Sequence, residues 1–271
     1  MKKNRIITVV LILVFLTGAS LLLYPTVSNL WNSFHQSMAI TEYTEQTEKL
    51  DRKTCERLWA DAESYNKKLL DNPERFTMTD EQKTEYDQLL DLSGDGIMGY
   101  IEVPAIDCSL PIYHGTDEAA LQTAIGHLEG SSLPTGGKGT HCVLSGHRGL
   151  PSARLFTDLD ELKEGDVFIL KVLDRTMTYE VDQILTVDPY DLEPLEIDPE
   201  MDYCTLVTCT PYGINTHRLL VRGHRITNLP DFNSGRSQEG EKALLAAASA
   251  ALVISAVAAV LMLLLRIRRK I

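Results

Sequence analysis

The chain has 271 residues, 44% of them hydrophobic, and its formal net charge is −12 at pH 7. Seven of the 26 basic residues lie in the two terminal tails and none of the 38 acidic residues does, so the segment between the tails carries a formal charge of −19. Such a surface argues against nucleic acid or anionic lipid as the main partner. The roughly 220 residues between the tails are enough for one well-buried domain with a smaller appendage.

An apolar block near each end is long enough to cross a membrane as a helix, which takes about 20 apolar residues. The first runs from Ile6 to Tyr24 within a predicted anchor of residues 1–29, and the second from Ala243 to Leu265 within a predicted span and tail of residues 243–271. Positively charged flanks stay in the cytoplasm. We therefore expect a protein of the cell membrane with both termini inside and the segment between the blocks outside. The flanking charges are Lys2, Lys3, Arg5, Arg266, Arg268, Arg269 and Lys270.

A cleaved signal peptide is the alternative for the first block, because Thr17, Gly18 and Ser20 interrupt it. No small-x-small cleavage site stands out, which favours an uncleaved anchor. Cleavage would leave the same topology for the rest of the chain.

Residues 30–95 have a polar, helical pattern with few glycines or prolines and with apolar positions three and four residues apart. Pro73 interrupts this pattern. A short helix is expected to follow over about residues 80–90, with Thr79 as its N-cap.

Residues 96–227 change to short apolar runs between turn residues, many of them rich in Val, Ile, Thr and Tyr. With only short helical inserts (DEAALQTAI and FTDLDELKE), seven or eight strands predict a mainly β fold, an eight-stranded closed β-barrel. Residues 228–242 are polar and contain Gly and Ser, so they are expected to be a linker. The strand-like runs are IMGYIEVPAI, CSLPIYHG, THCVLSGH, DVFILKVLD, RTMTYEVDQILTVD, YCTLVTCT and HRLLVRGHRI.

Cys209 ends the strand-like run TLVTC just before Pro211, where a side chain can reach a cleft. Alternation places Thr205, Val207 and Cys209 on one face of that strand. By position alone a small buried hydrophobe is the favoured interpretation, since most free cysteines are of that kind. The odd count of five cysteines nevertheless leaves at least one thiol unpaired, which is a hint of chemistry.

His147 lies at a strand-to-loop junction between glycines, in SGHRG, a usual place for a functional side chain as well as for a solvated one. In HRLLVRGHR, alternation places Arg218 and Arg222 on one face of a strand. Arginines so placed are more often solvent-facing charges. They could also stabilise a thiolate and an oxyanion.

Two other uses of the cysteines are weaker. Zinc binding is less favoured than a thiol reaction, because no pair of ligand doublets has zinc-site spacing. A disulfide between Cys204 and Cys209 is disfavoured too, because residues five apart on a strand face opposite sides.

The motifs TLVTC, an arginine nine residues later and the upstream SGHRG together resemble a sortase, a membrane-anchored cysteine transpeptidase of Gram-positive bacteria. The similarity runs from about Gly96 to Ile226 and includes GIMGYIEVPAID, LPIYHGT and AIGHLEGSSLPTGG in the family's order. The two anchors and the helical N-terminal region resemble class C, the type that assembles pili. The resemblance implies no metal or other cofactor.

Carried over to this sequence, the resemblance implies that Cys209 is the nucleophile and His147 the general acid/base. It implies that Arg218 stabilises the oxyanion, with Arg222 as the competitor that shares its face. His217 and His224 match no such position.

One region departs from the family. Many class C sortases carry a contiguous Asp-Pro-aromatic lid, whereas LDNPERFTM here has Asp71, Pro73 and Phe76 apart. We expect a degenerate lid over residues 66–80 that packs beside the barrel without an anchoring contact to Cys209. Few buried contacts are expected to hold it, which would leave the segment mobile and the thiol accessible.

The implied reaction is cleavage of an LPxTG-like sorting signal between Thr and Gly through a thioester, with transfer to an amine of a pilin lysine or of a cell-wall peptide. The implied partners are therefore pilins or surface proteins, an amine acceptor and the lipid bilayer. Two alternatives are a secreted cell-wall thiol hydrolase and a non-catalytic, membrane-tethered binding barrel.

Overall fold

The computed structural model describes residues 2–228, and the chain divides into two compact units after Trp31. Helix α1 (Lys2–Glu48) begins in the first unit and carries the N-terminal apolar block. From Ile6 onward it is long and apolar enough to cross a membrane by length and composition. The predicted second span, Ala243–Leu265, and residues 229–242 of the predicted linker lie outside the described residues.

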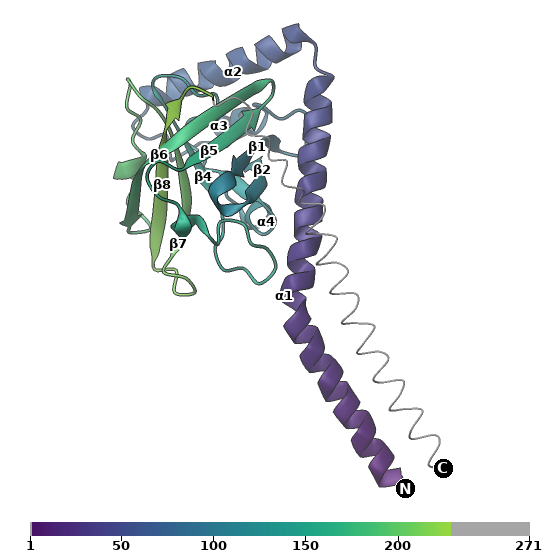
Figure 1. Cartoon of the computed structure of the whole chain (residues 1–271). Helices are drawn as coiled ribbons and strands as arrows, with labels where there is room; N and C mark the ends of the chain where they lie inside the picture. Colours follow the sequence, from purple (N-terminus) through teal and green to yellow (C-terminus); the bar gives the residue numbers. More distant parts are fainter. Residues whose placement is uncertain (1, 229–271) are drawn as a thin grey trace. The chain divides into compact units, whose positions relative to one another are not determined.

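Eight strands form a closed barrel, as predicted (Figure 1). Around the barrel they are ordered β1-β2-β3-β4-β7-β8-β6-β5. Most neighbours are antiparallel, but β2 with β3 and β4 with β7 are parallel. The strands are β1 (Ile97–Val103), β2 (Cys108–His114), β3 (Ile125–His127), β4 (Thr140–Ser145), β5 (Val167–Val172), β6 (Arg175–Val187), β7 (Asp202–Thr210) and β8 (His217–Ile226).

Alternation along the strands fills the barrel interior. On β7, Cys204 and Leu206 point into the main core, whereas Val207 belongs to a separate cluster on the outer face. The seven predicted runs correspond to seven of the strands. The eighth, β3, has three residues and is too short to show a periodicity.

The short helices differ in how well the sequence predicted them. Helix α3 (Asp80–Asp87) begins as expected after Thr79, which forms a capping box with Gln82. The insert DEAALQTAI contains α4 (Glu118–Leu121). The insert FTDLDELKE contains a short 3₁₀ helix, η2 (Leu159–Glu161), and no α-helix. The remaining 3₁₀ turns are η1 (Pro104–Ile106) and η3 (Glu193–Leu195).

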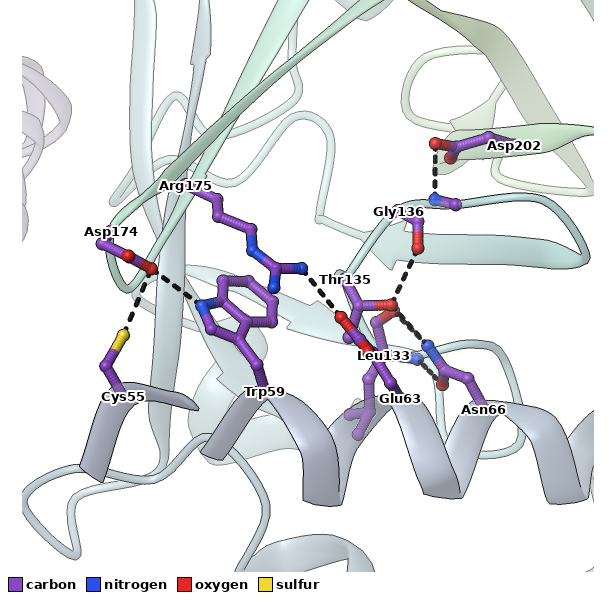
Figure 2. A network of polar contacts seen from close by, with 11 residues as sticks. Cys55, Trp59, Glu63, Asn66, Leu133, Thr135, Gly136, Asp174, Arg175 and Asp202 are labelled. Carbon is purple, nitrogen blue, oxygen red and sulfur yellow. Dashed lines mark hydrogen bonds and ion pairs between the residues drawn. The ribbon is translucent and has the colours of Figure 1, made fainter. Parts of the chain in front are cut away.

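Helix α2 (Arg52–Leu70) packs its buried face on the barrel, and Figure 2 shows the polar contacts that hold it there. Asp174, in the turn between β5 and β6, accepts hydrogen bonds from Trp59 Nε1 at 2.8 Å and from Cys55 Sγ at 3.2 Å. The guanidinium of Arg175 lies 3.9 Å above the Trp59 ring. Asn66 pairs with the backbone of the loop before β4. Residues 52–70 are therefore part of the same compact unit as the barrel.

Candidate active site

Cys209 and Arg218 lie directly opposite each other on the antiparallel strands β7 and β8. Directly opposed residues of an antiparallel pair point to the same face, with Cβ atoms about 5 Å apart. Both side chains are half-buried on the outer face of the barrel. Arg218 Nη1 donates to the His217 carbonyl oxygen at 3.1 Å, and within residues 2–228 no carboxylate lies within ion-pair distance of its guanidinium. The register thus places an arginine without a carboxylate partner beside the thiol.

Arg222 shares that face but is engaged elsewhere. It pairs with Thr205 across the strands, about 13 Å along β8 from Arg218. Both Asp182 oxygens accept from its guanidinium, at 3.0 and 3.2 Å, and its Cζ lies 4.1 Å above the Tyr203 ring. Alternation along β8 places both arginines on one face and so does not show which of them lies beside Cys209. The strand register and the ion pair with Asp182 show that it is Arg218.

His147 follows β4, which runs parallel to β7 and ends at the same end of the barrel as Cys209. Ser145 pairs with Val207, and the ladder continues as Gly146 N donates to the Val207 oxygen at 3.0 Å. His147 follows Ser145 by two residues, and Cys209 follows Val207 by two residues. The segment after β4 and the end of β7 therefore lie side by side. The imidazole is 28% exposed, with Nε2 3.8 Å from an exposed carboxylate oxygen of Glu118. The three predicted site residues therefore converge at the same ends of neighbouring strands.

The glycines around His147 are required by close packing. A Cβ on Gly146 would come within 2.7 Å of Phe156 and 2.9 Å of Ile125. Gly149 has a φ of +76° and lies against the Tyr212 ring. Tyr212 also lies beneath the guanidinium of Arg148, 5.6 Å from its Cζ. These contacts join the loop after β4 to the loop after β7, a role for Arg148 and Tyr212 that sequence reasoning missed.

An apolar surface continues from Cys209 and Arg218 along the outer face of the barrel, and we call it the outer apolar cluster. Val207 is two residues before Cys209 and Leu220 two residues after Arg218, so both belong to the face that carries the thiol. Such a surface suits an apolar segment of a peptide. The buried members are Val143, Leu195 and Leu220, with Phe76, Leu128, Leu185, Val187 and Val207 packed against them.

The predicted lid segment is held more firmly than expected. Asp71 caps the end of α2, Pro73 is exposed and Phe76 packs in the outer apolar cluster. Arg75, only 5% exposed, donates to the Leu195 oxygen at 3.1 Å and to a Glu196 carboxylate oxygen at 3.2 Å. The expectation of few buried contacts is therefore wrong.

The error arose because the expectation rested only on the Asp-Pro-aromatic spacing, whereas the anchor is an arginine inside that motif. Gly130 makes room for it, since a Cβ there would lie 2.3 Å from the Arg75 oxygen. The accessibility of the thiol in the resting protein stays a prediction.

We expect Arg75→Ala to destabilise the protein by about 1–3 kcal/mol, because it leaves the buried Leu195 carbonyl without its charged donor. Urea unfolding measures this loss, and limited proteolysis should cleave residues 71–79 faster. Lys138→Ala is the matched control, since it removes an ion pair whose partners are 75% and 76% exposed. Its effect should stay within about 0.5 kcal/mol. Equal effects of the two variants would contradict the anchoring role of Arg75.

Two sizeable cavities in the described part of the chain are not lined by Cys209, His147 or Arg218. A cavity of about 710 Å³ is lined by residues of α2 and by Asp202, and one of about 550 Å³ by Tyr203 and Arg222. The first lies near the start of β7, roughly 20 Å from Cys209, and the second lies beside the part of the outer apolar cluster that contains Leu185. Within residues 2–228 no group of three or more His, Cys, Asp or Glu side chains is arranged to hold a metal ion.

A closed β-barrel that gathers a thiol, an imidazole and a guanidinium at adjoining strand ends has the parts of a thiol-dependent acyl-transfer enzyme. A protein-family model described as "Sortase domain" matches residues 101–226. Sortase D of Bacillus subtilis is 33% identical over 132 residues, which are 48% of this chain and 64% of that relative. The match thus spans less than two thirds of that relative's length.

Solved structures cover more of the chain. Sortase C1 of Streptococcus agalactiae is 52% identical, with a TM-score of 0.68, over 71% of this chain and all of that one. Sortase C of Streptococcus pneumoniae is 47% identical, with a TM-score of 0.65, over 72% of this chain and all of that one. The chain belongs to the sortase family of cysteine transpeptidases and is similar to its class C members.

Proposed function

We propose that this protein is a membrane-anchored transpeptidase that cleaves an LPxTG-like sorting signal between Thr and Gly and joins the new end to an amine. The observation that carries the proposal is the placement of Cys209 opposite Arg218 on paired strands. His147 follows β4, the strand that pairs with β7 on its other side. Val207, a half-buried member of the outer apolar cluster on the same face as the thiol, is the proposed contact for the apolar part of the signal.

In the first half-reaction, the Cys209 thiolate attacks the carbonyl carbon of the Thr–Gly bond. Only a thiolate is an effective nucleophile. Arg218 and a backbone N–H donate to the oxyanion that develops. His147, protonated, gives its proton to the departing glycine nitrogen. The C–N bond breaks, and the acyl group stays on Cys209 as a thioester.

In the second half-reaction, an amine attacks the thioester carbonyl and loses a proton to His147. The C–S bond breaks, an amide forms and the thiolate is restored. The acceptor is a pilin lysine or a cell-wall peptide amine. The similarity to Sortase C of S. pneumoniae, whose structure is described in terms of pilin substrate specificity, favours the pilin lysine.

The proposed location is the cell membrane, with both termini cytoplasmic and the barrel outside. The support is the apolar helix α1 from Ile6 onward together with the basic residues that precede it. The acidic barrel segment then faces the cell wall, where its substrates and acceptors lie.

Product analysis tests the proposal. The full chain in detergent is incubated with a labelled sorting-signal peptide and with a lysine-bearing pilin peptide, a cell-wall-type peptide amine or no added amine. Mass spectrometry identifies the products, and a scrambled signal peptide is the control. A new amide to one of the amines is expected, together with a thioester on the protein. Hydrolysis alone would favour a cell-wall thiol hydrolase. Neither cleavage nor thioester would favour a binding barrel.

A further inference from the structure

Two cysteines outside the proposed site lie side by side inside the barrel. Cys142 on β4 and Cys204 on β7 are register partners in the parallel pair. Their exposures are 2% and 0%, and both belong to the main core. Local sequence spacing raised a disulfide only between Cys204 and Cys209, because the partner of Cys204 lies 62 positions away in the chain and only the register reveals it.

The geometry suits a covalent bond between these two sulfurs. Neighbouring strands lie about 4.8 Å apart, and disulfides join Cα atoms about 4.4–6.8 Å apart. Register partners point to the same face, so both thiols face the barrel interior. Each side chain is therefore already directed at the other.

A histidine completes the cluster. His127 on β3 is fully buried, hydrogen-bonded to the Tyr86 hydroxyl at 2.8 Å and to the Ser132 oxygen at 2.8 Å. Burial alone raises the pKa of the Cys142 thiol, but hydrogen bonds with Cys204 and His127 outweigh burial and lower it. Burial and the adjacent Cys142 raise the pKa of Cys204.

We propose that Cys142 and Cys204 form a disulfide that ties β4 to β7 when the chain folds in contact with a disulfide oxidant, either a small-molecule disulfide or a thiol–disulfide oxidoreductase. The oxidising setting rests on the proposed extracellular location. The pairing itself rests on the register and does not depend on any transpeptidase activity.

The bond forms by two successive thiol–disulfide exchanges. The Cys142 thiolate attacks one sulfur of the oxidant disulfide, whose S–S bond breaks and releases one thiolate. Cys204 then loses its proton and attacks the Cys142 sulfur, which releases the second oxidant thiolate. The two cysteines lose two electrons and two protons, and the oxidant becomes two thiols. Because both sulfurs are buried in the folded barrel, this exchange precedes closure of the strands.

The proposed disulfide would lie close in sequence to two residues of the candidate active site. Cys142 lies five residues before His147, and Cys204 lies five residues before Cys209. A bond between them fixes the parallel register that brings the backbone before His147 alongside the end of β7. It does not consume Cys209, because an odd separation along a strand places Cys209 on the opposite face from Cys204.

Refolding under controlled redox conditions tests the pairing. The full chain is denatured and reduced, then refolded in detergent with mixed oxidised and reduced glutathione or with dithiothreitol. Free thiols are alkylated after denaturation, and digested peptides are identified by mass spectrometry. With glutathione we expect a linked pair of peptides containing Cys142 and Cys204, and with dithiothreitol alkylation of both. The oxidised protein should also unfold at a higher urea concentration.

Two variants are the controls. Cys204→Ser should lose both the linked peptides and the redox dependence of the urea midpoint, whereas Cys55→Ser should keep both. Alkylation of both Cys142 and Cys204 in glutathione-refolded protein with native circular dichroism would overturn the proposal. Linkage of either cysteine to Cys55, Cys108 or Cys209 instead would overturn it as well.

Discussion

Cys209→Ala is expected to abolish both cleavage of the sorting-signal peptide and its transfer to an amine. Under the proposed mechanism the variant has no sulfur to form the thioester, so the expected loss in rate is on the order of 10⁴–10⁶-fold. The side chain is half-buried at the end of β7, and alanine leaves only a small gap there. The fold should therefore survive, which circular dichroism and urea unfolding check alongside the rate.

The matched controls are Cys55→Ala and Cys108→Ala, which remove thiols elsewhere in the chain. Cys55 bonds to Asp174, which keeps its bond from Trp59 when the thiol is removed, and Cys108 lies on β2. Both variants should retain peptide cleavage and transfer. Wild-type turnover in Cys209→Ala would eliminate the proposed mechanism, and a loss in all three variants would mean that the effect is one of folding.

Arg218→Ala is expected to lower the rate of thioester formation by about 10²–10³-fold, the usual cost of removing one oxyanion donor. The structural basis is its register position opposite Cys209 and its freedom from any carboxylate partner among residues 2–228. Single-turnover measurement with the sorting-signal peptide isolates this step. Arg218→Lys should recover only part of the rate, because an ammonium lacks the planar fork of donors.

Arg222→Ala is the matched comparison on the same strand and face. It removes the double hydrogen bond to Asp182 and the contact with Tyr203, and the side chains of Arg222 and Asp182 are only 22% and 23% exposed. We expect it to cost about 1–2 kcal/mol of stability and to leave the rate of the first half-reaction much less affected. Equal losses of rate in the two variants would show that position on the face, and not the register, determines the oxyanion donor.

Local pattern was enough for several features of this protein. The change from helical to strand-like spacing near Gly96, the positions of seven of the strands, and the Thr79 cap all follow from preferences that act over a few residues. So does the placement of Cys209 and His147 where strands end, because Pro211 and the glycines around His147 interrupt the strands on each side. The spacing of Arg218 from Cys209 came from the family resemblance and is matched by the register.

Tertiary structure decided what depends on residues far apart in the chain. Alternation put Arg218 and Arg222 on one face, but only the pairing of β7 with β8 and the Asp182 ion pair distinguish them. Strand β3 forms because β2 and β4 flank it, not because three residues specify a strand. Arg75 is buried by a loop about 120 positions later, and Cys142 meets Cys204 through a parallel pairing of distant strands. Such contacts are set by how the barrel closes, and closure depends on the packing of the whole core, which no short window of sequence contains.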